Sequence, residues 1–243
     1  MPGRPAVAAL SCCTALLAHA GPPFVTDDPE PVGLRHWEIN TAATASWRGP
    51  QGSFGLPSVD INYGAGENVQ LHAQPRFDLE RGGGTNRGID DTEVGIKYRF
   101  VDQGEEGHAF MMGVYPMLRL ATGARRLGQD RGTHGVFLPM WLQLDRGPWT
   151  AYGGVGYRLN REVGGRNSTF AGLTILREVR EGLQVGVEGF HETSTATAAR
   201  PTTGFNVGAV KRLTGRLNLL ASIGRARSES PVNLAYLGLQ VHF

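Results

Sequence analysis

The sequence predicts an all-β fold: a single antiparallel transmembrane β-barrel of about twelve strands, with short periplasmic turns and longer extracellular loops. The last ten residues, Leu234–Phe243, alternate strictly between two faces and end on an aromatic side chain, as the closing strand of such a barrel does. The connections between predicted strands alternate between short and long. No apolar run of about 18 residues, the length that indicates a transmembrane helix, follows the first twenty residues.

The N-terminal segment Met1–Ala20 has the pattern of a secretory signal peptide. Arg4 supplies a positive charge, a short apolar run follows, and Ala18–Ala20 is a small-x-small cleavage site. Cys12 and Cys13 both fall in this segment, so the exported chain would contain no cysteine, which excludes disulfides, cysteine nucleophiles and thiolate metal sites. Export with cleavage near Ala20 predicts a location in the outer membrane of a Gram-negative bacterium.

Residues 21–34 form a Pro-rich, acidic lead-in that we expect on the periplasmic side, and residues 35–243 form the predicted barrel. Two interpretations of the lead-in stay open. Its proximity to the first strand and its stiffness suggest a small plug in the periplasmic mouth, whereas its composition also suits a disordered tail.

Twelve strands are predicted where apolar and polar residues alternate between turn signals. Their ranges are 35–47, 56–65, 69–80, 91–101, 108–121, 134–145, 149–160, 168–178, 182–192, 203–212, 216–226 and 233–243. The short connections are 66–68, 102–107, 146–148, 179–181 and 213–215, and the longer ones are 48–55, 81–90, 122–133, 161–167, 193–202 and 227–232. An even number of strands places both termini on the periplasmic side.

The two faces of the predicted strands differ in polarity. In the first strand, Trp37, Ile39 and Trp47 share a face, and Glu38 and Asn40 lie on the other. In a barrel the apolar face contacts lipid and the polar face lines the lumen. Prolines interrupt three strands, at Pro75, Pro116 and Pro139. Because proline cannot donate to a strand ladder, we expect bulges or local openings there.

The predicted lumen is narrow, because eight strands enclose only side chains and sixteen leave an open channel. Its candidate lining residues are charged or titratable and lie on the polar faces. They are Asp60, His72, Arg76, Glu93, Lys97, Arg99, Arg158 and Glu188. Opposed charges across a narrow lumen favour passage of small polar or charged solutes. The alternative is that these side chains form ion pairs that only fill and stabilise the interior.

Several strands resemble those of one family. Asp91–Phe100 reads DTEVGIKYRF, Trp149–Tyr157 reads WTAYGGVGY, and similar matches occur at Pro23–Pro29, at Thr203–Gly208 and in the last two strands. In order and spacing they resemble the outer-membrane family labelled "meta-pathway of phenol degradation". The resemblance covers nearly all of the chain after the signal segment. It implies a channel or transporter for aromatic or other small hydrophobic compounds. The resemblance assigns no catalytic residues to this chain.

Other functional classes are less favoured by the residues. A lipid-modifying barrel enzyme would need a paired nucleophile and base, and the candidate pair is His191 with Ser194. A closed structural barrel and a soluble periplasmic β protein also stay open. No cofactor is expected, the histidines lack metal-ligand spacing, and a formal net charge of +2 is too balanced to indicate nucleic-acid binding.

The expected partners follow from the barrel interpretation. They are outer-membrane lipid and lipopolysaccharide around the wall, the barrel-assembly machinery through the strand that ends at Phe243, and a small-molecule solute in the lumen.

Overall fold

A computed structural model describes residues 22–81, 85–89, 91–105, 107–122, 135–160, 165–197 and 199–243. The predicted signal peptide lies outside these residues. The described part of the chain holds no helix long and apolar enough to cross a membrane.

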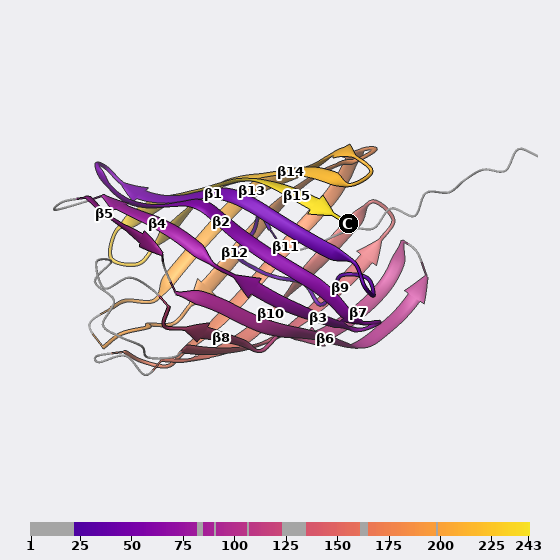
Figure 1. Ribbon diagram of the computed structural model, residues 1–243, viewed down its shortest axis with the longest axis horizontal. Coiled ribbons are helices and arrows are strands. Elements are labelled where there is room, and N and C mark those ends of the chain that lie inside the picture. Colours follow the sequence, from indigo (N-terminus) through magenta and orange to yellow (C-terminus); the bar gives the residue numbers. More distant parts are fainter. Residues whose placement is uncertain are drawn as a thin grey trace, which may run out of the picture.

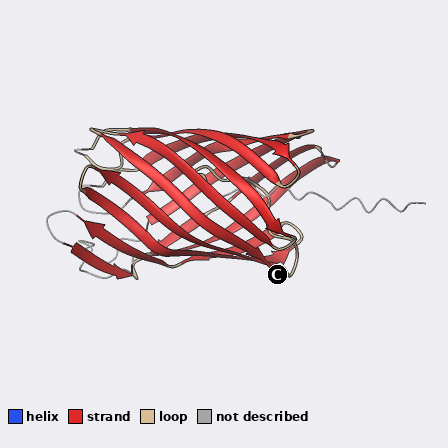
Figure 2. Ribbon diagram, turned by 90° about the horizontal axis from the view of Figure 1, so that it is seen from above, coloured by secondary structure: helices blue, strands red, loops and turns tan. Residues whose placement is uncertain are grey.

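The described chain folds into one closed antiparallel sheet (Figures 1 and 2). Its strands are β1 (Trp37–Arg48), β2 (Gln51–Gly66), β3 (Val69–Gln74), β4 (Arg76–Arg81), β5 (Thr85–Ile89), β6 (Thr92–Glu105), β7 (His108–Val114), β8 (Met117–Leu120), β9 (Gly135–Arg146), β10 (Trp149–Leu159), β11 (Ser168–Arg180), β12 (Leu183–Glu192), β13 (Thr202–Thr214), β14 (Leu217–Arg227) and β15 (Pro231–His242). The pairs β3–β4, β5–β6 and β7–β8 are each one interrupted barrel strand, so the wall has the twelve strands that the sequence predicts.

The barrel closes where β1 pairs with β15 on one side and with β2 on the other. Ten residue pairs join β1 to β15, from Glu38 opposite His242 to Trp47 opposite Asn233. Next to the Glu38–His242 pair, the backbone N–H groups of Trp37 and Phe243 each donate to the other's carbonyl, at 3.2 and 3.0 Å. Such closure satisfies the backbone polar groups, which lipid cannot do.

The two ends of the barrel differ in their connections. The end that carries Trp37 and Phe243, here called the turn end, has five connections of two residues each: 67–68, 106–107, 147–148, 181–182 and 215–216. The opposite end, here called the loop end, has connections of up to 14 residues, the longest being 121–134. The predicted alternation is confirmed at three of the six loop-end connections, 121–134, 160–167 and 193–201. The other three, 49–50, 82–84 and 228–230, have only two or three residues. The prediction of a long connection over residues 81–90 is wrong, because β5 lies within that range and pairs with β4.

The first connection at the loop end is also shorter than predicted, and its predicted range of residues 48–55 is wrong. β1 ends at Arg48 and β2 begins at Gln51, so the connection is Gly49 and Pro50 alone. Gly49 has a φ of 57°, which glycine adopts without the steric cost of a Cβ atom. The stretch 51–55 was expected in the loop because it contains two glycines, but it pairs with β1 and β4 instead.

The prolines act on the strands as expected at two sites and differently at the third. Pro75 separates β3 from β4, and Pro116 lies in the gap between β7 and β8. Pro139 leaves β9 continuous, because it lies beside that same gap and its carbonyl accepts the N–H of Tyr115 at 3.2 Å.

The strand faces have the predicted polarity. Large apolar side chains are exposed on the outer face, among them Leu71, Ile96, Tyr98, Val155, Val187, Phe205, Ile223 and Leu237. The inner face buries polar side chains, including Asn40, Asn62, Gln70, Gln143, Thr174, Asn206 and Gln240. A wall with apolar residues outside and polar ones inside is that of a transmembrane barrel.

One sector of the inner face is aromatic instead of polar. Phe137 and Trp141 of β9 pack edge-on against Phe170 of β11, with ring centroids 6.1 to 6.4 Å apart. Phe190 of β12 stacks on Phe170 at 6.3 Å. Three of these four residues lie within two positions of a strand terminus at the loop end, so the cluster lies toward that end of the lumen.

Glycines on neighbouring strands make room for these rings. A Cβ atom at Gly156 of β10 would overlap the Phe137 ring, and one at Gly154 would crowd Trp141. Gly204 of β13 has the same relation to Phe190. The Gly-rich, aromatic pattern of β10 therefore reflects rings that cross from the adjacent strand and lie over glycine backbone.

Candidate functional site in the barrel interior

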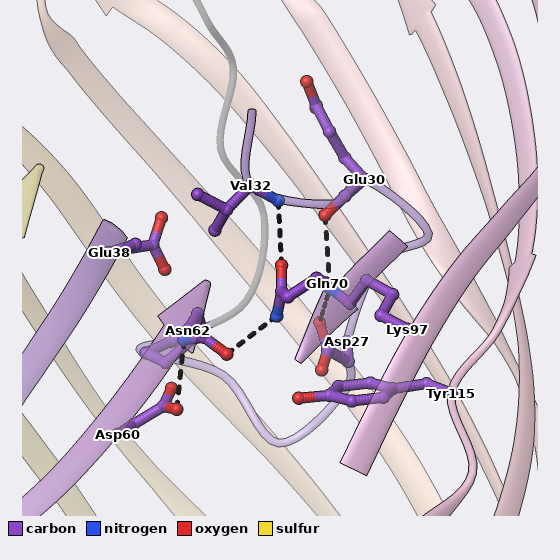
Figure 3. A pocket seen from close by; sticks show the side chains of 10 residues that line it. Asp27, Glu30, Val32, Glu38, Asp60, Asn62, Gln70, Lys97 and Tyr115 are labelled. Atoms are coloured by element: carbon purple, nitrogen blue, oxygen red, sulfur yellow. Dashed lines mark hydrogen bonds and ion pairs between the residues drawn. The ribbon is translucent and has the colours of Figure 1, made fainter. Parts of the chain in front are cut away.

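The segment that precedes β1 lies inside the barrel. Thr26 and Asp28 are 1% and 0% exposed, although neither belongs to a strand. Figure 3 shows Asp27, Glu30 and Val32 of this segment beside side chains of the wall. Residues 22–34, here called the luminal segment, therefore occupy the middle of the lumen, and their contacts define the candidate site.

Glu188 of β12 holds one end of the luminal segment. Its carboxylate accepts the backbone N–H of Val25 at 2.9 Å and that of Thr26 at 2.5 Å. Asn206, the cross-strand neighbour on β13, donates its side-chain amide to the same carboxylate. Nearby on β14, the Ser222 hydroxyl donates to the carbonyl of Pro23 at 2.7 Å. These contacts fix the segment against β12 and β14, and Asn206 of β13 orients the Glu188 carboxylate.

Lys97 of β6 holds the centre of the segment. Its ammonium group lies 3.1 Å from Asp27 Oδ1 and 3.3 Å from Asp28 Oδ1, and it also donates to the carbonyl of Glu30 at 3.3 Å. The Tyr115 ring lies 5.0 Å from the same nitrogen. Because Lys97 is 4% exposed, these interactions are shielded from solvent and depend on one another.

The far side of the segment contacts a chain of amide and carboxylate groups (Figure 3). The Gln70 side-chain oxygen accepts the N–H of Val32 at 2.9 Å, and its amide donates to Asn62 at 2.7 Å. Asn62 donates in turn to Asp60 at 3.0 Å. His72 Nδ1 lies 2.9 Å from the Asp60 carboxylate. The buried polar groups of β2 and β3 are thus tied to one another and to the segment.

Several glycines of the wall lie where the segment approaches closely. A Cβ atom at Gly64 of β2 would overlap the Gly33 carbonyl, and one at Gly172 of β11 would overlap the Thr26 hydroxyl. Gly208 of β13 faces the Phe24 ring in the same way. Because these wall residues are glycines, the inner face leaves room for the luminal segment to pass close to the backbone of the wall.

The predicted lining residues do not form one group. Asp60, His72, Lys97 and Glu188 lie in the middle of the interior, and Lys97 and Glu188 contact the luminal segment directly. Glu93 joins them at the edge, 3.9 Å from His72 Nε2.

The other predicted lining residues lie toward the ends. Arg99 pairs with Asp102 at 2.8 Å and donates to Asn68 in a turn at the turn end. Arg158 lies toward the loop end, 3.1 Å from Glu192 and 4.3 Å from the centre of the Phe137 ring. The side chain of Arg76 lies outside the described part of the structure.

Two cavities adjoin the segment. A small void of about 30 Å³ lies between it and strands β1, β2, β3 and β6, and Asp27, Glu30, Glu38 and Asp60 contribute carboxylates to its lining. A larger cavity of about 660 Å³ lies on the turn-end side and reaches the glycines of four turns, 107, 147, 182 and 215. Five carboxylates line it: Glu30, Asp102, Glu105, Asp145 and Glu178. We call this larger cavity the vestibule.

The candidate catalytic pair does not form in the structure. His191 Nδ1 lies 2.7 Å from the Thr203 hydroxyl on β13. The Ser194 hydroxyl donates instead to the carbonyls of Ala196 and Ala199, both at 2.6 Å. Both side chains thus make bonds that stabilise the strand end and the loop. Among the described residues, no group of three or more His, Cys, Asp or Glu side chains has the geometry of a metal site.

Sequence reasoning missed the partners of the charged residues. The period-two alternation of the strands could have predicted which side chains point inward, including Gln70, Asn206 and Ser222. Their contacts with Val32, Glu188 and Pro23 could not be predicted, because no periodicity indicates where an irregular segment enters a lumen. The inward aromatic cluster was also missed, because aromatic residues in such strands usually face lipid.

Comparison with solved structures finds outer-membrane barrels. The fold is similar to the COG4313 outer-membrane channel from Pseudomonas putida F1, with 18% sequence identity, a TM-score of 0.65, and coverage of 93% of this chain and 100% of that one. It is also similar to the KdgM porin, at 11% identity, TM-score 0.57, and 85% and 99% coverage. The NanC porin aligns at 6% identity, TM-score 0.56, and 84% and 98% coverage. No family model and no curated protein sequence matches the chain.

Proposed function

We propose that the protein is an outer-membrane channel that passes small molecules passively. The observation that carries this proposal is the closed twelve-stranded wall with an apolar outer face and a polar interior around a cavity of about 660 Å³. The similarity in fold to the COG4313 channel and to the KdgM and NanC porins supports it. On this proposal the turn end faces the periplasm and the loop end faces the exterior.

The luminal segment narrows the path. It lies between the aromatic cluster at the loop end and the vestibule at the turn end, and it fills the space between Glu188 and Lys97. Passage of a solute larger than an ion requires this segment to shift. The segment therefore acts as a plug, and deletion of residues 22–34 should raise the conductance of the purified barrel in a planar bilayer. Unchanged conductance after the deletion would remove the segment from the conduction path.

The preferred solutes are aromatic or other small hydrophobic compounds. The aromatic cluster of Phe137, Trp141, Phe170 and Phe190 supports this finer proposal, since these rings point into the lumen. The resemblance of Asp91–Phe100 and Trp149–Tyr157 to the phenol-degradation family also supports it.

Swelling of liposomes that carry the refolded barrel tests both the passage of small molecules and the preference for aromatic compounds. Uncharged aromatic compounds and sugars of similar size are supplied outside, and the rates of swelling are compared. Faster swelling with aromatics supports the finer proposal, and equal rates support a general narrow pore. No swelling with either solute, for protein shown to be folded by its heat-dependent gel mobility, would favour a closed structural barrel.

A further inference from the structure

We propose that the barrel interior selects cations over anions. This inference rests on the proposed channel function and names the charge of the permeating species. It follows from the signs of the charges along the lumen.

The buried charges are the first observation. In the described part of the chain, the buried carboxylates are Asp28, Glu38, Asp60 and Glu188, whereas Lys97 is the one buried lysine or arginine. Asp27, Glu30 and Glu93 add three partly exposed carboxylates to the same region. Carboxylates therefore outnumber ammonium groups beside the luminal segment.

The contacts of these carboxylates stabilise them mostly without cancelling their charge. Glu188 accepts hydrogen bonds from two backbone N–H groups and from the Asn206 amide, all of which are neutral donors. Asp60 accepts from Asn40 and Asn62, with His72 at 2.9 Å. Hydrogen bonds from neutral groups leave the negative potential of the site in place. Asp28 contributes less to this potential, because it pairs with Lys97 at 3.3 Å and burial raises the pKa of its carboxyl group.

The vestibule carries the same sign. Five carboxylates line it, whereas the guanidinium groups that line it are those of Arg99 and Arg212. A permeating ion thus passes two successive regions with an excess of negative charge. Charged groups that line a narrow passage with low-dielectric walls raise the local concentration of counter-ions and exclude co-ions, and salt screens this effect.

The reversal potential in a salt gradient measures this property directly. The protein without its predicted signal peptide, but with residues 22–34 present, is refolded and placed in a planar bilayer. The KCl concentrations on the two sides are unequal. We expect a reversal potential of the sign that indicates K⁺ permeation, and a smaller value at high ionic strength. A potential of the opposite sign, or of zero, overturns the inference and leaves the channel proposal intact.

A lack of conductance has a different meaning. If neither the intact protein nor the variant without residues 22–34 conducts, the proposed function fails and the inference fails with it. If the deletion variant conducts, its cation preference should be weaker than that of the intact channel, because Asp27, Asp28 and Glu30 are removed. A cation preference that is stronger after the deletion would contradict the charge assignment.

Substitutions that change the charge in opposite directions separate selectivity from folding. Asp60→Asn combined with Glu188→Gln should move the ratio of K⁺ to Cl⁻ permeability toward one. Lys97→Gln should increase that ratio, which damage to the fold would not do. Glu67→Gln is the matched control, because Glu67 is exposed in the turn between β2 and β3. Equal ratios in all of these variants would overturn the inference.

Discussion

Glu188 accepts the backbone N–H of Thr26 at 2.5 Å, across 162 residues of sequence. This bond joins strand β12 of the barrel wall to the segment that precedes the first strand. Val25 donates its N–H to the same carboxylate. One inward side chain thus satisfies two adjacent backbone donors of a segment that has no strand partner.

Replacement of Glu188 by Gln should loosen this end of the luminal segment. The neutral amide keeps one acceptor oxygen but loses the charge, and hydrogen bonds to charged groups contribute about 1.5–3 kcal/mol each. We therefore expect the amide protons of Val25 and Thr26 to exchange with solvent about tenfold faster or more. Hydrogen exchange read by mass spectrometry on peptides that cover residues 22–34 measures the change.

Glu178→Gln is the control for that exchange experiment. The Glu178 carboxylate accepts the N–H of Gly182 at 3.0 Å in a turn, so it also binds a backbone donor but does not contact the segment. Exchange of the segment should stay at the rate of the unaltered protein in this variant. Equal acceleration in both variants would mean that Glu188 stabilises the barrel as a whole.

Replacement of Lys97 by Met should destabilise the protein more than a surface substitution does. Asp27 and Asp28 would lose their shared cation, and removal of one partner of a buried ion pair typically costs about 3–5 kcal/mol. The free energy of unfolding in urea, followed by heat-dependent gel mobility, reports the loss. Addition of Asp27→Asn and Asp28→Asn to Lys97→Met should recover part of it. A triple variant no more stable than Lys97→Met alone would contradict the assigned pairing.

Replacement of Gly156 by Ala should destabilise the barrel through the Phe137 ring. A Cβ atom at position 156 overlaps that ring, and overpacking of this kind costs about 1–3 kcal/mol. Phe137→Leu in the same chain should reduce the penalty, because the smaller side chain leaves room. Gly189→Ala is the control, since a Cβ atom there meets nothing within 4 Å. Additive effects of Gly156→Ala and Phe137→Leu in a double-mutant cycle would argue against contact between these positions.

The wall of the barrel could be predicted from the sequence because its signal is local. Alternation along Trp37–Trp47 determines which side chains face outward, and the turn residues between strands determine the spacing of the ladder. Gly49-Pro50 shows the limit of that reasoning. A glycine-rich stretch after this turn resembles a loop, yet Gly52 and Gly55 continue in β2 because both neighbouring strands pair with them.

The interior could be predicted less well because its contacts join distant parts of the chain. The polar face of each strand indicates that Lys97 and Glu188 point inward, but the sequence does not show that Asp27 and Thr26 meet them. The inward aromatic rings depend on glycines in adjacent strands, such as Gly154 beside Trp141. Such pairs become visible only once the register of the strands is known.

Replacement of Gly64 by Ala should displace the luminal segment without shortening the chain. A Cβ atom at position 64 would overlap the backbone of Val32 and Gly33, which cannot yield as a flexible side chain does. Because the wall strands keep their own pairing, we expect the segment to move and the barrel to stay folded. Single-channel conductance should then rise toward that of the variant without residues 22–34. Gly66→Ala is the matched control, since its Cβ atom would meet only Val69, at 3.4 Å or more. If Gly64→Ala folds with heat-dependent gel mobility like that of the unaltered protein and conducts no better than Gly66→Ala, the segment does not limit conductance.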